Sequence, residues 1–217
     1  MRDVVEIQLT RVKAHLVLEP ELTLIDCGYA GSSGRIAQAI EAQGRSATEL
    51  RRVVITHGHP DHAGSARELA ALGATLLLHP DDWPGLRRRW RDLARERSRG
   101  AVFSAMTPTP DTFQPIEDGE ILPMLGGLRV IHTPGHTPGS VCLYGERDRI
   151  LFVGDTLQRR FGRLSCASRL YSDDYQAARR AVQRLTGLDV ETLVFSHYPV
   201  LETGAAAEIA QLAGTVI

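Results

Sequence analysis

Apolar residues alternate with polar ones in the first part of the chain and then recur at helical spacing. The alternation predicts three strands of a β-meander, at residues 4–9, 12–18 and 22–25. Ile36, Ala39 and Ile40 then follow a helical stripe, which stops at Gly44. The next runs predict a strand, a helix and a strand, at 53–55, 63–72 and 74–78. Strands that alternate with helices in this way indicate an α/β fold.

The second half of the chain repeats the order of strands, helix and strand. Four short apolar runs predict strands, at 121–123, 128–131, 140–144 and 150–153. A helix is predicted over 173–185 with Ser172 as its N-cap, followed by a strand at 192–195 and a closing helix over 204–213. Because no linker of low complexity separates the halves, we expect residues 1–217 to form a single domain.

The segment between the two halves is rich in arginine. Residues 81–99 carry seven arginines and, at helical spacing, four large apolar side chains. We favour a helix whose charged face lies in solvent, and a lid helix that steers anionic substrates is the alternative. Residues 101–115, with Pro108 and Pro110, predict a loop over or beside the functional site.

The composition is that of an ordinary globular protein, with 43% hydrophobic and 24% charged residues. A net charge of -1 and a pI of about 6.7 predict no general attraction to nucleic acid or to acidic membranes. No apolar stretch approaches the length of a membrane span, and the N-terminus lacks the apolar core of a signal peptide, so a cytoplasmic location is expected. The three widely spaced cysteines are expected to be buried apolar side chains.

A dense cluster of residues that can bind a metal follows the strand predicted at 53–55. Four such side chains fall within six residues: His57, His59, Asp61 and His62. Neutral imidazole and ionised carboxylate are the usual ligands of zinc and of other divalent transition metals. Gly58 and Pro60 favour a tight loop in which alternate side chains converge on a small volume. A single histidine at a helix start usually only forms hydrogen bonds, but four such residues together favour a metal site.

Three other loops at strand ends offer similar side chains. They present His136, Asp155 and His197. The turn around His136 contains two prolines and two glycines, which make it rigid. Loops at the ends of strands commonly carry the functional residues of a protein. Three further histidines lie in or beside strands and are expected to be structural: His15, His79 and His132.

These motifs resemble those of the metallo-β-lactamase-fold hydrolases, and the glyoxalase II-like branch in particular. That family's pattern is Thr-His-x-His-x-Asp-His, followed by Gly-His, Gly-Asp and a final His, and all seven metal-binding positions match here. The segment 24–28 is also similar to the family's strand that ends in Asp-x-Gly, so the resemblance spans about residues 12–200. It implies an αββα sandwich in which helices flank two mixed β-sheets and a binuclear metal centre lies along one edge.

The resemblance also implies the ligands of two divalent metal ions, expected to be zinc, with iron or manganese as alternatives. One ion would be held by His57, His59 and His136. The other would be held by Asp61, His62 and His197, and Asp155 would bridge the two. Such a pair of ions can share a hydroxide and lower its pKa, with Asp61 and Asp155 beside it as the catalytic carboxylates. Asp26 would either orient a ligand histidine or only stabilise a turn.

The favoured reaction is the hydrolysis of a small ester, thioester or lactone, in which the metal-bridged hydroxide attacks the carbonyl carbon. A mononuclear iron persulfide dioxygenase is the alternative, with His57, His136 and Asp155 as the iron ligands. A sensor of a metal or another ligand, without enzymatic activity, is less favoured, because a structural site would not need so many ligands. The expected partner is a small-molecule substrate, and the oligomeric state, a homodimer included, is left open.

Overall fold

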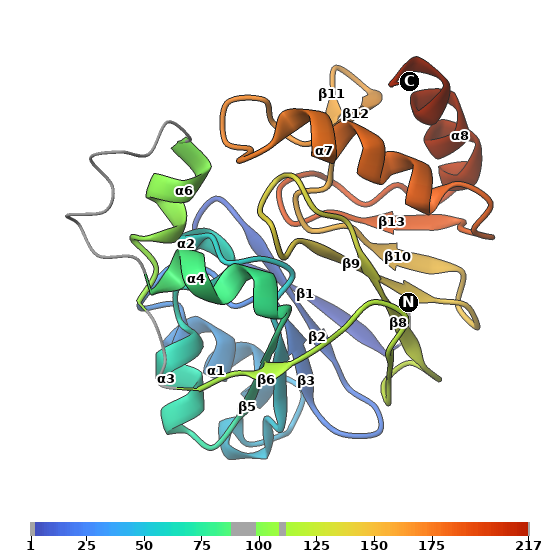
Figure 1. The fold of residues 1–217 in the computed structure, drawn as a ribbon. Helices are drawn as coiled ribbons and strands as arrows, with labels where there is room; N and C mark the ends of the chain where they lie inside the picture. Colours follow the sequence, from blue (N-terminus) through green and yellow to red (C-terminus); the bar gives the residue numbers. More distant parts are fainter. Residues whose placement is uncertain (1–2, 88–98, 109–111, 217) are drawn as a thin grey trace.

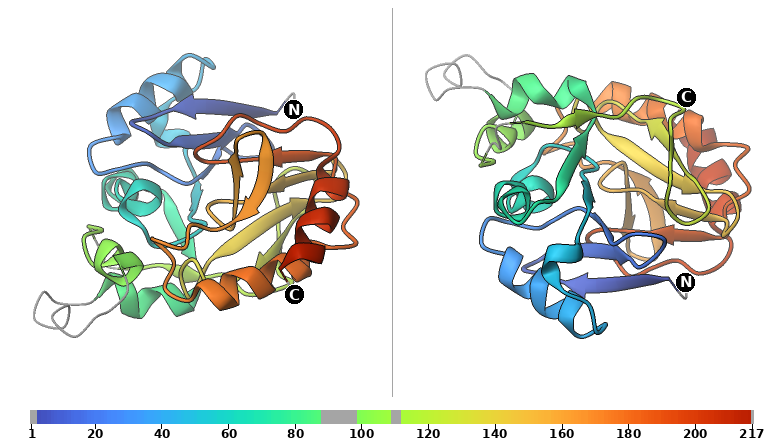
Figure 2. Two further views of the ribbon diagram at one scale, coloured as in Figure 1. Left: turned by 90° about the horizontal axis from the view of Figure 1, so that it is seen from above. Right: turned by 90° about the horizontal axis from the view of Figure 1, so that it is seen from below.

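Two β-sheets lie face to face, and helices cover their outer faces (Figure 1). The computed structural model describes residues 3–87, 99–108 and 112–216. Seen from above, α1 (Ser33–Glu41) and α3 (Ala66–Ala71) lie on one side of the sheets, with α7 (Tyr175–Ala181) and α8 (Ala205–Thr215) on the opposite side (Figure 2). This arrangement is the αββα sandwich expected from the sequence.

The first sheet is built by the first half of the chain, with strand order β1-β2-β3-β4-β5-β6. Its strands are β1 (Val4–Gln8), β2 (Lys13–Val17), β3 (Thr23–Ile25), β4 (Arg52–Val54), β5 (Thr75–Leu78) and β6 (Gln114–Pro115). The pairs among β1, β2 and β3 are antiparallel, as expected for a meander, and the pairs from β3 to β6 are parallel. Parallel neighbours need crossover connections, and α1 and α3 lie in two of them.

The second sheet has the strand order β13-β10-β9-β8-β7. Its strands are β7 (Ile121–Leu122), β8 (Leu128–His132), β9 (Val141–Gly145), β10 (Ile150–Phe152) and β13 (Thr192–Val194). The pair β10 and β13 is parallel, and the pairs from β10 to β7 are antiparallel. A separate hairpin, β11 (Leu157–Arg160) and β12 (Arg163–Cys166), lies in the crossover from β10 to β13.

Short helices fill the remaining connections. They are α2 (Pro60–Ala63), α4 (Trp83–Leu86), α6 (Arg99–Ser104) and the 3-10 turns η1 (Ala47–Glu49), η2 (Pro80–Asp82) and η3 (Val182–Leu185). No helix among the described residues is long and apolar enough to cross a membrane. The three cysteines are free and buried, as predicted.

Three apolar clusters hold the layers together. Val54 and Phe152 belong to the cluster between the sheets, Ile36 and Leu69 to the one under α1 and α3, and Ile209 to the one under α7 and α8. Each such side chain, when fully buried, stabilises the fold by about 1.5–3 kcal/mol. Because both faces of each sheet are packed, the strand ends that carry the candidate ligands have fixed positions.

Two predicted helices differ from those observed. The helix predicted over 63–72 is divided at Gly64, where a Cβ atom would lie 2.5 Å from the backbone nitrogen of Ala30. The close approach of these two segments therefore requires glycine. The helix is interrupted at the next residue, Ser65, whose backbone nitrogen donates to the carbonyl of Gly28 over 3.2 Å. The second helix begins at Tyr175 and not at 173, because Asp174 is the N-cap and accepts a hydrogen bond from the backbone of Ala177. The Ser172 hydroxyl, predicted as the cap, donates to a backbone carbonyl of its own loop.

Two other stretches also depart from the predictions. The segment 101–115, predicted as a loop, includes most of α6 and the short strand β6. Of the arginine-rich segment 81–99, residues 83–86 form α4, whereas residues 88–98 lie outside the described part of the chain, so both interpretations of this segment stay predictions. The β11–β12 hairpin was not predicted, because its strands are only four residues long each.

Candidate metal centre

The seven candidate ligands come from four loops, each of which follows the end of a strand. The segment after β4, which includes α2, carries four of them, and the loops after β8, β10 and β13 carry one each. Because β4 belongs to the first sheet and the others to the second, packing of the two sheets brings the loops together. Pro60 is the first residue of α2 and His59, in an extended conformation, is its N-cap. The chain therefore turns sharply between His59 and Asp61.

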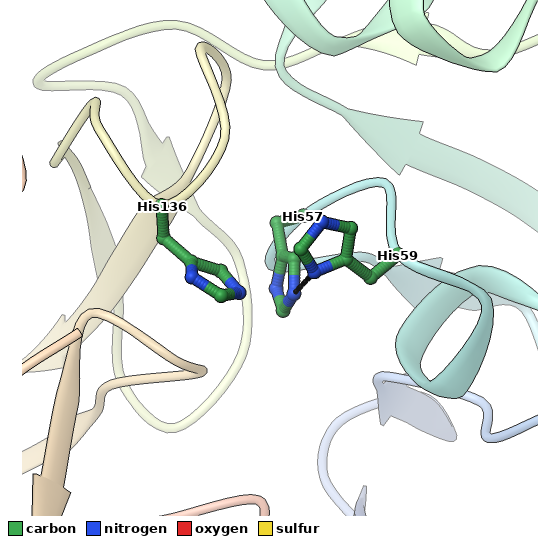
Figure 3. Close-up of side chains that lie close together, drawn as sticks. All are labelled: His57, His59 and His136. Atoms are coloured by element: carbon green, nitrogen blue, oxygen red, sulfur yellow. Dashed lines mark hydrogen bonds between the residues drawn. The ribbon is translucent and has the colours of Figure 1, made fainter. Parts of the chain in front are cut away.

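The imidazoles of His57, His59 and His136 form the first ligand group (Figure 3). One nitrogen of each ring lies within 4.8 Å of a nitrogen of the other two. Nε2 of His57 is 3.2 Å from Nδ1 of His59, and the ring centroids of His59 and His136 are 4.6 Å apart. Burial, and then the neighbouring histidines, lower the pKa of His57 and of His136 well below the ordinary value. These two rings are therefore neutral and keep the lone pairs that a metal requires.

Asp61, His62 and His197 form the second ligand group. Nε2 of His197 is 3.3 Å from Nε2 of His62 and 3.4 Å from Oδ2 of Asp61. Burial alone would lower the pKa of His62, but the carboxylates of Asp26 and Asp61 outweigh it and raise the pKa to about 10. Burial would likewise raise the pKa of Asp61, whereas His62 and His197 lower it. His62 therefore holds a proton at neutral pH that a bound cation would replace.

Asp155 lies between the two groups. Its Oδ1 is 3.3 Å from Nε2 of His197 and 3.6 Å from Nε2 of His62. Its Oδ2 is 3.5 Å from Nε2 of His136. One carboxylate oxygen thus faces each ligand group. Burial raises the pKa of Asp155, although His62 and His197 oppose the change.

Asp26 orients one of the candidate ligands. Its side chain is fully buried, and Oδ2 accepts a hydrogen bond of 2.7 Å from Nδ1 of His62. Oδ1 accepts a bond of 2.8 Å from the backbone nitrogen of Thr56, and Ser196 donates to Oδ2 over 3.2 Å. With its Nδ1 proton held in this way, His62 presents Nε2 to the centre. Of the two roles considered for Asp26, these contacts support the orientation of a ligand histidine.

The three histidines outside the family pattern are placed differently. His15 on β2 contacts Phe152 edge to face, with ring centroids 5.7 Å apart, and burial lowers its pKa to about 4. His79 and His132 stack with centroids 3.9 Å apart and an angle of 14° between the rings, and Asp81 lies beside them. Because the two rings are nearly parallel, their nitrogen lone pairs lie in two separate planes and do not converge on one point. This pair is therefore arranged for packing. Nε2 of His132 also donates to the Pro138 carbonyl.

A cavity of about 290 Å³ opens above both ligand groups. Besides the candidate ligands its lining includes Arg11, Tyr29, Gln158, Arg160, Tyr171 and Tyr198. Arg11 lies in the turn between β1 and β2, and Arg160 ends β11, so their approach to the centre depends on tertiary structure.

The donor atoms of the centre fit divalent metal ions. Among the described residues, Nε2 of His136 and Oδ1 of Asp61 are buried and make no hydrogen bond. A buried polar atom without a partner is unfavourable, and coordination of a cation would satisfy both atoms. Imidazole nitrogen and carboxylate oxygen are ligands that zinc, iron and manganese accept.

Comparison with known proteins agrees with this geometry. The family model of the metallo-β-lactamase superfamily matches residues 14–197, which include all seven candidate ligands. The protein belongs to this superfamily. The probable metallo-hydrolase YflN of Bacillus subtilis is 26% identical over 88% of this chain and 80% of its own. The hydroxyacylglutathione hydrolase of Methylococcus capsulatus is 30% identical over 80% of this chain, which spans only 56% of that enzyme.

Solved structures of the superfamily share the fold. The metallo-β-lactamase family protein TTHA1429 from Thermus thermophilus superposes on 99% of this chain and 79% of its own, with a TM-score of 0.79 and 20% identity. TTHA1623, in a di-iron-bound form, superposes on 95% of this chain and 97% of its own, with a TM-score of 0.72 and 28% identity. The αββα fold and the membership of the superfamily, both predicted from the motifs, are confirmed.

Proposed function

We propose that this metallo-β-lactamase superfamily protein is a binuclear metal-dependent hydrolase of a small ester, thioester or lactone. The observation that carries the proposal is the position of Asp155, whose two carboxylate oxygens face the two ligand groups. A carboxylate shared in this way offsets part of the repulsion between two cations held close together. In this proposal Asp155 is the bridging ligand and, with Asp61, a catalytic carboxylate.

The other candidate ligands would be divided between the two ions, one ligand group for each ion. His57, His59 and His136 would hold one ion, and Asp61, His62 and His197 the other. When bound, the two ions would activate water as a nucleophile and stabilise negative charge on a carbonyl oxygen. Zinc is the expected metal; the di-iron form of TTHA1623 keeps iron as an alternative, and manganese is a further one.

The residues of the chain itself would prepare the centre for this chemistry. The neutral rings of His57 and His136 supply lone pairs without first losing a proton. Asp26 fixes the tautomer of His62 through its hydrogen bond to Nδ1. The cavity of about 290 Å³ favours a small substrate, and Tyr29 and Tyr198 at its wall carry hydroxyls that can donate hydrogen bonds.

The class of substrate is supported by one relative. Hydroxyacylglutathione hydrolase, by its name, cleaves the acyl group from a glutathione conjugate, which is a thioester. Because this chain spans only 56% of that enzyme, we propose the class of bond and not the glutathione portion.

The test combines metal analysis with an activity panel. Protein purified from unsupplemented medium is analysed for zinc, iron and manganese, and is then assayed with p-nitrophenyl acetate, an acyl thioester and a small lactone. We expect two metal ions per chain and hydrolysis of at least one substrate. A chelator should abolish this hydrolysis, and added zinc should restore it. One iron per chain, with oxygen consumption on glutathione persulfide and no hydrolysis, would contradict the proposal and support the dioxygenase.

A further inference from the structure

Asp82, at the end of η2, is a buried acidic residue outside the seven candidate ligands. Its side chain is only 3% exposed. Oδ2 accepts hydrogen bonds from the backbone nitrogen of Gly58 over 2.7 Å and from Oγ1 of Thr137 over 2.8 Å. Oδ1 accepts one from the backbone nitrogen of Gly139 over 2.6 Å. All of these donors are neutral groups of two loops, so the carboxylate joins segments that are about 80 residues apart.

The two loops are those of the first ligand group. Gly58 lies between His57 and His59, and Thr137 directly follows His136. The first loop extends from β4 of one sheet, and the second connects β8 and β9 of the other. The hydrogen bonds to Asp82 therefore hold both loops within three residues of a candidate ligand, across the junction of the two sheets.

The surroundings of the carboxylate are shaped to admit it. A Cβ atom at Gly139 would lie 2.7 Å from the backbone nitrogen of Asp82 and 2.8 Å from its Cγ. Only glycine allows this approach, which gives a reason for one of the two glycines in the turn around His136. The Gly58 carbonyl is held as well, by the hydroxyl of Thr107 over 2.9 Å.

The sheets are also joined at this junction without Asp82. The backbone nitrogen of Val141 donates to the carbonyl of Thr56 over 2.9 Å, next to the ends of the strands. Loss of the Asp82 carboxylate should therefore leave the sandwich assembled while the loops beyond the strands move relative to one another. We therefore expect the position of His136 relative to His57 and His59 to depend on Asp82.

We infer that Asp82 is a positioning residue of the candidate metal centre: by joining the two loops it sets the affinity of the first ligand group for its metal ion. The inference rests on the proposed function, because it assumes that this group binds a metal. Asp26 has the corresponding role in the second group, where it bonds directly to His62. Asp82 instead acts through the backbone of the loops that carry the ligands.

The test measures zinc affinity of the metal-free protein by competition with a chromogenic chelator at pH 7.5. Burial raises the pKa of Asp82 to about 6, so its carboxyl group is ionised at this pH. The variant Asp82→Asn keeps the size of the side chain but loses one of its acceptor oxygens. The matched control is Asp81→Asn, because the Asp81 side chain is adjacent in sequence and 57% exposed. We expect Asp82→Asn to weaken one of two zinc ions by about 10–100-fold, and Asp81→Asn to weaken neither.

A double-mutant cycle assigns the effect to one group. In the variant His136→Ala the first group is incomplete, so adding Asp82→Asn should not change the affinity of the remaining ion. If Asp82→Asn does not fold, Thr137→Val removes one of the three hydrogen bonds and should still weaken the first ion, by about three- to tenfold. Thermal unfolding of each metal-free variant separates a loss of stability from a loss of affinity.

The outcomes separate this inference from the proposed function. Wild-type protein that binds two zinc ions, with unchanged affinities in Asp82→Asn and Thr137→Val, would overturn the positioning role and leave the proposed function standing. A lower melting temperature in these variants at unchanged zinc affinity would show that Asp82 is merely structural. Wild-type protein that binds no divalent metal would overturn the proposed function, and this inference with it.

Discussion

The two ligand groups differ in charge and in how the fold supports them. Burial lowers the pKa of His57 and His136 in the first group, whereas carboxylates raise the pKa of His62 and His197 in the second. Asp82 supports the first group through loop backbone, and Asp26 supports the second through a ligand side chain. The difference indicates two sites that respond differently to protons and to mutation, although Asp155 connects them.

The largest effect is expected when this connection is removed. Asp155→Ala takes away the carboxylate whose two oxygens face the two groups, so metal should be lost and kcat/KM should fall about a thousandfold or more. The measurements are metal content per chain and hydrolysis of the best substrate of the panel. Asp148→Asn is the control, because Asp148 is exposed in the turn between β9 and β10. Full metal content in Asp155→Ala would contradict the bridging role.

A second mutation should weaken metal binding in the second group and not in the first, which is the reverse of the effect of Asp82→Asn. Asp26→Asn removes the charge that holds the proton on Nδ1 of His62, so the ion of the second group should be weakened by about 10–100-fold. The ion of the first group should be nearly unaffected. Chelator competition on Asp26→Asn and Asp82→Asn, side by side, tests this selectivity. Equal weakening of both ions in both variants would show that the two groups are not supported independently.

The pH dependence of binding should also differ. The pKa of His62 is about 10, so below that pH its proton competes with the cation, and the affinity of the second group should rise by up to about tenfold per pH unit. The lowered pKa of His57 and His136 leaves no such proton, so the first group should change little between pH 7 and 8.5. The zinc affinity of the His136→Ala protein measures the second group, and that of the His197→Ala protein measures the first. Equal changes in zinc affinity with pH in the two variants would refute this difference between the groups.

The smallest effect concerns the cavity that the two groups share. Arg160 lines this cavity. Arg163, which pairs with it across the β11–β12 hairpin, lies outside the lining and therefore serves as the matched control. Arg160→Gln should raise KM for an ester that carries a carboxylate by about threefold, and less at high salt. KM for a neutral ester should not change, and Arg163→Gln should behave as wild type. A rise for both esters would point to a loss of packing and not of charge.

The sequence was most informative where function depends on local spacing. His57 to His62 lie within one loop, and their identities alone predicted a metal site; the order of the later ligands added the family and the fold. Asp82 gave no such signal, because its partners Gly58 and Gly139 meet it only after the sheets pack. The division of the helix next to Gly64 was missed for the same reason, since the backbone of Ser65 bonds there to Gly28, which is distant in the sequence. Local sequence pattern therefore predicted the candidate metal ligands, whereas the residues that position these ligands depend on tertiary packing.

The central claim is that two adjoining ligand groups each bind a metal ion. Calorimetric titration of zinc into the metal-free protein at pH 7.5 tests it most directly. We predict two ions per chain in the wild-type protein and one in His136→Ala, with the remaining affinity close to that of the second wild-type ion. Saturation of the wild-type protein at one ion per chain would contradict the claim.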